Sequence, residues 1–232
     1  MRRRRAPSMA PPVSESRPIL CVVLDAAAFG PEPGRFARGL FRAGADWLQL
    51  RDRTIEGRDH LAWTRSVVEA AREGTGDPGA ALARPRRVLV NRRLDVALAA
   101  EAGGVHLGFD APTAAEARRL LPKDALVGGS LHSADEVERA DEAGSPYDYV
   151  HLAPIWAPNS KPMSRPPLGL ETLDRACRGG IPILAQGGID PDRARQAIRA
   201  GAVGIAVTGD IRSETEPEST IRRLRAVLDG QI

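Results

Sequence analysis

The chain has 232 residues, of which 33 are basic and 30 acidic, and it is 42 % hydrophobic but only 4 % aromatic. This length fits one large α/β domain or two small ones, with a core built from Leu, Val, Ile and Ala. A formal net charge of +3 is too balanced to indicate nucleic-acid binding, and no segment reaches the ~18 consecutive apolar residues of a membrane span.

The N-terminus carries most of the excess positive charge, in the run MRRRR. Residues 1–17 contain prolines and polar residues without a periodic apolar face, so we predict a disordered leader before a folded domain at 18–232. A tether to nucleic acid or to a membrane is the alternative to a solvated tail. No apolar run follows the arginines, and Cys21 and Cys177 lack metal-ligand spacing. We therefore expect a cytoplasmic protein with no nucleic-acid or membrane partner.

Eight short segments rich in β-forming residues recur along the chain. Strands are predicted at 19–24, 46–50, 86–91, 104–108, 125–129, 147–152, 181–185 and 203–207. Several of these segments are continuous apolar runs, which is typical of strands that are buried on both faces.

Helical patterns lie between these strands, and three of them carry start and stop signals. For the helix at 113–121, Thr113 is the predicted N-cap and Glu116 completes a capping box. Helices are also predicted at 133–144, after a serine cap, and at 191–200, where a proline suits the first helical position.

Eight successive strand–helix units predict an α/β fold, a (β/α)8 TIM barrel in a single domain. A doubly wound sheet is the alternative, but it normally shows a G-x-G-x-x-G turn after the first strand, and VVLDAAAFGPEPG does not supply one. In a barrel the functional groups lie in the loops that follow the strands.

The second strand ends in QLRDR, which gives the first group of candidates. Strand alternation places Gln49, Arg51 and Arg53 on one side and Asp52 on the other. Two guanidinium groups at a barrel mouth suit a phosphate or a carboxylate. A surface pair between arginine and Asp52 is the alternative. Asn91 closes the third strand and faces the same mouth.

The later strand ends add further polar residues. Ser130 and His132 follow the fifth strand in ALVGGSLHS, and Lys161 lies in the proline-rich loop 153–169. A long loop of this kind is typical of an active-site lid.

The loops after the last two strands read QGGID and VTGDI. They contribute Gly187, Gly188, Thr208 and Gly209, whose backbone N–H groups can approach an anion next to a helix N-terminus. Because TIM barrels often hold a phosphate at these two loops, we predict a phosphate site there.

The motifs LQLRDR, VNRRLDVAL, GVHLG, GGSLHS, APIWAPNSKP, ILAQGGI and GIAVTGDI follow one another in order through residues 18–230. Together they resemble thiamine phosphate synthase and its paralogue, the thiazole tautomerase TenI. The resemblance implies a TIM barrel that binds a small-molecule thiazole phosphate at the glycine loops. A homo-oligomer is compatible with it.

The two relatives differ in their need for a metal. The synthase joins a pyrimidine diphosphate to the thiazole phosphate and releases pyrophosphate, with Mg²⁺ neutralising the leaving group. The family pattern places one ligand Asp directly after Asn91, where this chain has Arg92, and the other at Ala111, next to Asp110. We therefore predict no metal and no cofactor, with Mg²⁺ needed only in the synthase alternative.

The tautomerase moves a proton, and an imidazole can act as base and then as acid near neutral pH. By resemblance His132 is the catalytic residue, and the substrate is held by Gln49, Arg51, Arg53, Asn91, Ser130 and Lys161. We predict a metal-independent thiazole phosphate tautomerase of thiamine biosynthesis, an isomerase. The alternatives are a diverged thiamine phosphate synthase, a transferase in which Gln49 holds the pyrimidine, and a non-catalytic barrel that binds thiazole or thiamine phosphate.

Overall fold

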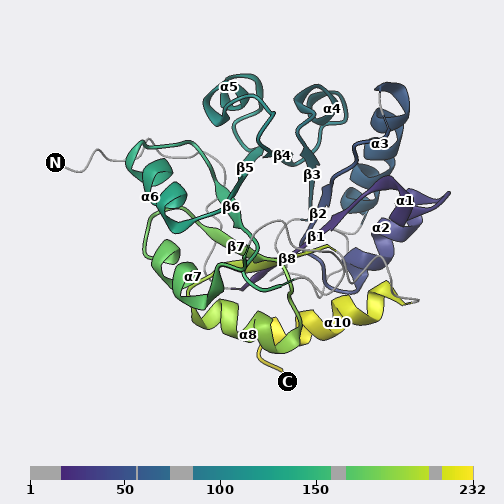
Figure 1. Cartoon of the computed structure of the whole chain (residues 1–232). Coiled ribbons are helices and arrows are strands. Elements are labelled where there is room, and N and C mark those ends of the chain that lie inside the picture. The colour runs from purple at the N-terminus through teal and green to yellow at the C-terminus, as the bar shows by residue number, and fades with distance from the viewer. Residues whose placement is uncertain (1–16, 56, 74–85, 158–165, 209–215, 232) are drawn as a thin grey trace.

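Eight parallel strands close into a barrel in the computed structural model, which describes residues 17–55, 57–73, 86–157, 166–208 and 216–231 (Figure 1). The strands follow chain order around the barrel: β1 (Ile19–Leu24), β2 (Trp47–Leu50), β3 (Arg87–Asn91), β4 (Gly104–Leu107), β5 (Leu126–Leu131), β6 (Tyr149–Leu152), β7 (Ile183–Gln186) and β8 (Gly204–Val207). The predicted (β/α)8 TIM barrel is confirmed, and the doubly wound sheet is excluded.

The helices surround the strands on the outside of the barrel (Figure 1). They are α1 (Ala26–Phe29), α2 (Pro33–Arg42), α3 (Gly57–Glu73), α4 (Leu94–Ala99), α5 (Ala114–Leu120), α6 (Ala134–Glu142), α7 (Gly169–Cys177), α8 (Pro191–Arg199) and α10 (Pro217–Leu228). The capping box that we predicted for α5 is confirmed: Thr113 Oγ1 accepts from Glu116 N, and the Glu116 carboxylate accepts from Thr113 N at 2.8 Å. Within the described residues, no helix is both long and apolar enough to cross a membrane.

Alternate residues of each strand face either the helices or the bore of the barrel. On β1, Leu20, Val22 and Leu24 pack against the surrounding helices, as the period of two requires. The opposite face joins the cluster that fills the bore, which consists of Ile19, Cys21, Val23, Trp47, Leu89, Leu126, Tyr149, Leu184 and Ala206. The bore is therefore a packed core at this level, and any site must lie above it.

The aromatic ring of Tyr149 crosses the bore and is tilted against Trp47, with 4.9 Å between ring centroids. A methyl group on Gly128 would overlap the Tyr149 ring, so the ring position depends on glycine in β5. We expect Gly128→Ala to lower the free energy of unfolding by about 1–3 kcal/mol through overpacking, measured by urea denaturation. Gly108→Ala is the control, since its added methyl meets only ordinary contacts. Equal stability of the two variants would contradict this explanation.

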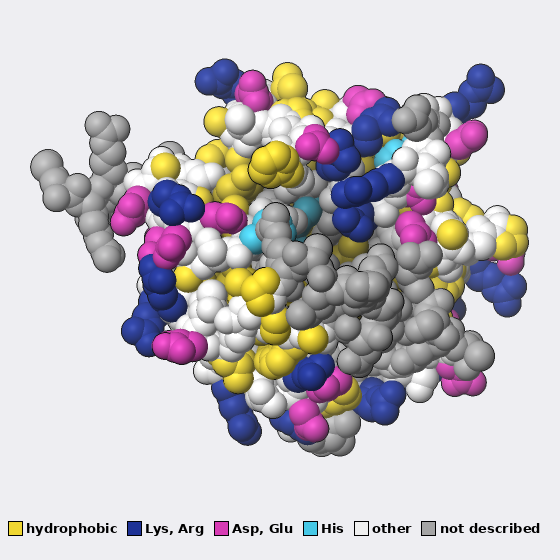
Figure 2. Space-filling model, in the orientation of Figure 1, with side chains coloured by type: hydrophobic (Ala, Val, Ile, Leu, Met, Phe, Trp, Pro, Cys, Tyr) yellow, Lys and Arg dark blue, Asp and Glu magenta, His cyan; other side chains and the backbone are white. Residues whose placement is uncertain are grey.

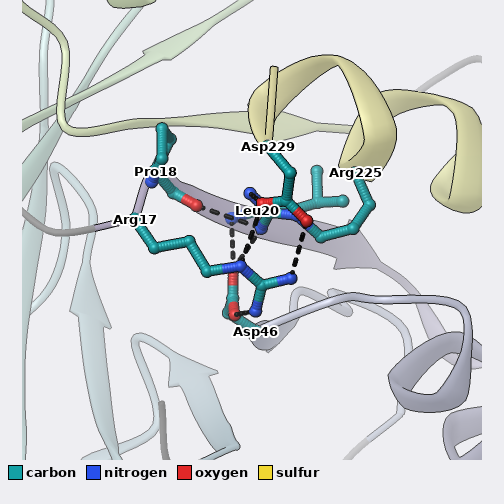
Figure 3. Close-up of polar contacts among 6 residues, drawn as sticks. All are labelled: Arg17, Pro18, Leu20, Asp46, Arg225 and Asp229. Atoms are coloured by element: carbon teal, nitrogen blue, oxygen red, sulfur yellow. Dashed lines mark hydrogen bonds and ion pairs between the residues drawn. The ribbon is translucent and has the colours of Figure 1, made fainter. Parts of the chain in front are cut away.

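A buried network of an ion pair and hydrogen bonds joins the two ends of the folded chain at the N-terminal side of the barrel (Figure 3). The Asp46 carboxylate accepts from Leu20 N at 2.8 Å and from Arg225 Nη1 at 3.0 Å. Arg225 Nη1 also donates to the carbonyl oxygen of Pro18 at 3.0 Å. Because Asp46 and Arg225 are only 5 % and 6 % exposed, this contact holds α10 against the first two strands with little screening by water.

Arg17, the last residue of the predicted leader, extends this network towards solvent (Figure 3). Its guanidinium group donates two hydrogen bonds of 3.0 Å to Asp229 and lies 3.6 Å from Asp46. Arg225 Nη2 lies 2.7 Å from the same Asp229 carboxylate. The network therefore begins one residue before the predicted start of the folded domain, and residues 1–16 lie outside the described part of the chain.

Candidate functional site

Polar side chains replace apolar ones in the C-terminal half of the bore. These polar residues are Gln49, Asn91, His106, Ser130, His151 and Gln186. In its own strand, each follows by two positions a residue that faces the bore, which is either a member of the bore cluster or a glycine. The strand register brings Asn91 level with His106, and Ser130 level with His151. The sequence thus builds a polar layer directly below the mouth, where TIM barrels place their functional groups.

The Gln49 side chain offers an unused acceptor in this layer. Gln49 is 2 % exposed, and its Nε2 donates to Asn91 Oδ1 at 3.2 Å. Its Oε1 is buried and has no hydrogen-bond partner among the described residues. A buried polar atom left unpaired costs about 1–3 kcal/mol. The orphaned oxygen therefore marks a place where a ligand can donate a hydrogen bond.

His106 is satisfied on both ring nitrogens, at 3.1 Å from the Tyr149 hydroxyl and 2.8 Å from Ser130 Oγ. Burial holds the pKa of His106 well below its ordinary value, so the ring is neutral at pH 7. Its ring centroid lies 4.3 Å from that of His151, whose Nε2 is buried without a partner in the described structure. Burial also lowers the pKa of His151, to about 3.

The arginines after β2 are not neutralised by the aspartate between them. Asp52 instead accepts from Ala26 N at 2.8 Å and from the backbone N–H of Thr54 at 2.6 Å. Burial alone would raise the pKa of Asp52, but these and further hydrogen bonds lower it to about 2. The backbone N–H of Arg51 donates to the carbonyl oxygen of Leu24 at 2.7 Å, but neither guanidinium group has a hydrogen bond or an ion pair with a described residue. The surface Arg–Asp pair, our alternative for this segment, does not form.

A pocket of about 270 Å³ opens beside the polar layer. It is lined by Asp52, Arg53, Ile55, His60, Asn91, Arg92, Arg93 and Asp110. Figure 2 shows basic side chains gathered next to the central depression of this face. One ion pair spans the pocket lining, with Arg92 Nη2 3.2 Å from Asp110 Oδ2. The site is therefore electropositive and partly closed by its own counter-ion.

Ser130 and His132 take positions that differ from those expected. β5 runs through Leu131, so Ser130 lies in the strand and contacts His106 within the bore instead of standing in the loop. His132 follows the strand, and its Nδ1 lies 2.9 Å from the carbonyl oxygen of Ala153. Since a carbonyl only accepts, Nδ1 carries the proton in this contact.

The predicted phosphate residues lie at the ends of the last two strands. Gly187 and Gly188 have φ angles of +99° and +61°, which favour glycine because a Cβ is strained there. Thr208 Oγ1 accepts from Gln186 Nε2 at 3.0 Å, which links the two loops. Gly209 and Lys161 lie outside the described residues. Their roles, like those of the other predicted site residues, remain predictions.

Three members of the polar layer, His106, His151 and Gln186, were not among the site residues that we predicted from the sequence. Counting in steps of two from the inward-facing position of each strand would have grouped all three with Gln49 and Asn91.

Residues 20–211 match a protein-family model described as thiamine monophosphate synthase. The chain belongs to this family. The thiamine-phosphate synthase of Chlorobium phaeovibrioides is 38 % identical over 219 residues, which cover 94 % of this chain and 98 % of that one. The thiamine-phosphate synthase of Methanoculleus marisnigri is 40 % identical over 190 residues, covering 82 % and 84 %. Among solved structures, thiamine phosphate pyrophosphorylase from Pyrococcus furiosus superposes with a TM-score of 0.76 at 25 % identity, covering 94 % and 98 %.

The prediction of a thiazole tautomerase is wrong for this member of the thiamine monophosphate synthase family. The two relatives above that span most of the chain are named thiamine-phosphate synthase, which was our alternative. The error came from treating the missing carboxylates at Arg92 and Ala111 as loss of the synthase reaction. His132 thereby loses its basis as the catalytic proton carrier.

The residues present do not fit the Mg²⁺ that the family resemblance implies. Arg92 and Ala111 stand where the two carboxylate ligands are expected, and a guanidinium group repels a cation. The neighbouring carboxylate of Asp110 is instead paired with Arg92. Among the described residues, no three His, Cys, Asp or Glu side chains come together as a metal site.

Proposed function

We propose that this chain is a thiamine-phosphate synthase, a transferase that joins a pyrimidine methyl group, activated as a diphosphate, to a thiazole phosphate. The full-length relatives with that name support the reaction class. The single observation that carries the proposal is the buried, unpartnered Oε1 of Gln49 next to a pocket rich in arginine. A heteroaromatic ring with an amino group and a diphosphate needs both features.

The pyrimidine ring fits the polar layer in the bore. Its exocyclic amino group donates to Gln49 Oε1, which is held in place because Gln49 Nε2 is bound to Asn91. The neutral imidazole of His151 presents a second unpaired nitrogen in the same polar layer. A site whose buried polar atoms are completed only by the correct ring discriminates strongly against analogues that lack those groups.

The diphosphate fits the guanidinium groups at the mouth. In the reaction, the bond between the pyrimidine methylene carbon and the diphosphate oxygen breaks, and its electron pair leaves with the pyrophosphate. Negative charge therefore grows on the leaving oxygen in the transition state. Arg51 and Arg53 are available to stabilise that charge, because neither is paired with a described residue.

The thiazole phosphate fits the loops after β7 and β8. Gly187 and Gly188 let the backbone come close to a phosphate, and the N-terminus of α8 begins nearby at Pro191. We assign the phosphate to these glycines together with Thr208 and Gly209. This places the ring between the glycine loops and the pyrimidine, where its nitrogen can attack the methylene carbon.

The transfer needs no proton carrier, since the lone pair of a neutral thiazole nitrogen forms the new bond. In this proposal the His132 side chain lines the site and is held in place by its hydrogen bond to the carbonyl oxygen of Ala153. Ser130 orients His106 from within the bore. Lys161 is assigned to the substrate only through the family resemblance.

Incubation with the pyrimidine diphosphate and the thiazole phosphate is expected to yield thiamine phosphate and pyrophosphate in equal amounts, measured by chromatography and by a coupled pyrophosphate assay. Gln49→Leu is expected to raise KM for the pyrimidine substrate about tenfold, because the amino group loses its acceptor. KM for the thiazole phosphate should change much less.

Gln196→Leu is the matched control, because this glutamine is exposed on α8. It should retain both KM values. The proposed function is wrong if neither product forms from the two substrates, whether EDTA or Mg²⁺ is present. The assignment of the pyrimidine site is contradicted if Gln49→Leu and Gln196→Leu have the same KM for the pyrimidine substrate.

A further inference from the structure

The pocket beside Arg92 holds more positive charge than its own carboxylates neutralise. Of the two acidic residues in its lining, Asp52 is occupied by hydrogen bonds from the backbone N–H groups of Ala26 and Thr54. Asp110 is 67 % exposed and contacts Arg92. The pKa of Arg51 is lowered by burial and then by the positive charges of Arg53 and Arg92, and the charge of Asp25 offsets only part of this. Three guanidinium groups therefore repel one another at this edge of the mouth, and an anion between them would relieve the repulsion.

The backbone at Arg92 gives an independent reason to assign its side chain a function. Arg92 has a φ of +66°, in the left-handed region. A residue with a long side chain is strained there, whereas Asn and Asp are tolerated better. The backbone is fixed because Arg92 N donates to the carbonyl oxygen of His106 at 2.9 Å. Arginine is thus a costly choice for the backbone at this position, and its benefit must come from the guanidinium group.

His60 supplies a second polar group that lacks a partner in the pocket lining. It is 1 % exposed, and neither ring nitrogen has a hydrogen-bond partner among the described residues. Burial, followed by the charge of Arg93, lowers the pKa of His60, so its ring is neutral and one nitrogen carries a proton. Because His60 belongs to the pocket lining, its neutral imidazole is a polar group of the kind that can donate to a phosphate oxygen.

We propose that Arg92 replaces the divalent cation: the substrate diphosphate displaces Asp110 from Arg92 and is bound by Arg92, Arg51 and Arg53 without a metal. This inference rests on the proposed function, since it concerns the leaving group of that reaction. The Arg92–Asp110 pair is exposed on both sides, at 36 % and 67 %, and pairs of this kind contribute little stability. A diphosphate, which offers several oxygens for bidentate contacts, is a stronger partner for the guanidinium group.

Inorganic pyrophosphate, titrated calorimetrically into the full chain, tests this proposal. Binding is expected in EDTA, and Mg²⁺ at matched ionic strength and matched free pyrophosphate should add no affinity. Arg92→Gln should weaken binding in EDTA at least tenfold, because it removes a charge-assisted contact. Arg175→Gln is the matched control for the lost charge, since Arg175 pairs with Asp135 and Glu138 on the outer helices. It should change the affinity by less than twofold.

Two further variants separate this role from a folding defect. Asp110→Asn should tighten pyrophosphate binding severalfold, because the competing carboxylate is neutralised, and misfolding cannot produce such a gain. Arg92→Asp restores the carboxylate that the family pattern places after Asn91. It should abolish binding in EDTA and make any remaining binding depend on Mg²⁺.

The proposal is overturned if wild-type chain binds pyrophosphate only with Mg²⁺, if it does not bind pyrophosphate at all, or if Arg92→Gln and Arg175→Gln weaken binding equally. These outcomes are separate from the test of the proposed function. Turnover combined with a strict Mg²⁺ requirement for pyrophosphate would leave the synthase standing and remove the role of Arg92. Metal-free binding of pyrophosphate through Arg92 without any turnover would support the role of Arg92 and contradict the proposed synthase activity.

Discussion

Asp46→Ala is expected to lower the free energy of unfolding by about 3–5 kcal/mol, the usual effect of breaking a buried ion pair by removing one partner. The substitution leaves the guanidinium group of Arg225, which is 6 % exposed, without its buried carboxylate. It also removes the acceptor of Leu20 N at the start of β1. Urea denaturation followed by tryptophan fluorescence at pH 7 measures the change.

Two comparisons test whether the buried charge is the cause. Asp174→Ala removes an exposed ion pair with Arg178 on α7, and should change stability by less than about 1 kcal/mol. The double variant Asp46→Leu with Arg225→Met removes both charges and should recover much of the loss. If Asp46→Ala were no more harmful than Asp174→Ala, the network in Figure 3 would not hold the ends of the chain together.

The positions of the strands could be predicted because strands buried on both faces leave an unambiguous apolar pattern. All eight predicted segments overlap the observed strands, and the signals at Thr113 and Pro191 correctly mark the starts of α5 and α8. The end of β5 was less predictable. The prediction stopped at Gly129, because glycine is depleted in strands, yet Ser130 and Leu131 continue the strand because β6 pairs with them.

Contacts between residues distant in sequence could not be predicted from local patterns. Asp46 and Arg225 are 179 positions apart, and only closure of the barrel brings them together. The same holds for the ion pair between Arg92 and Asp110, which joins the loops of two neighbouring strands. A sequence shows which charged groups lie at the mouth, but not which of them neutralise one another.

The mistaken choice of reaction has a physical explanation. A reaction that expels pyrophosphate needs positive charge at the leaving group, and we assumed that only a metal held by carboxylates could supply it. Guanidinium groups can supply the same charge, and the mouth of this barrel contains Arg51, Arg53 and Arg92 close enough for their charges to interact. The absence of two metal ligands therefore bears on how positive charge is supplied to the leaving group, and it does not by itself identify the reaction that is catalysed.

Acidification below pH 6.5 is expected to destabilise the fold through its buried imidazoles. Burial lowers the pKa of His151 to about 3, with the Gln186 side chain acting in the opposite direction. Between pH 6.5 and 3, the unfolded chain therefore binds a proton that the folded chain excludes. The stability contributed by a neutral His151 is complete above pH 6.5 and is lost as pH falls, at about 1.4 kcal/mol per pH unit. Over the whole range this amounts to about 4–5 kcal/mol.

His151→Asn removes the group that binds this proton. The free energy of unfolding, measured in urea from pH 7 to pH 4, should therefore fall less steeply with decreasing pH, and the difference in slope should correspond to about one bound proton. Subtracting the two profiles cancels the carboxylates, which titrate in both proteins. His106 lies 4.3 Å from His151 between ring centroids, and burial lowers its pKa in the same direction, so His106→Asn should flatten the profile further. His132→Asn, at the partly exposed position after β5, is the control for loss of an imidazole. Parallel profiles for wild type and His151→Asn would mean that the bore admits the charged ring, and the neutral imidazole assigned to the pyrimidine site would have to be abandoned.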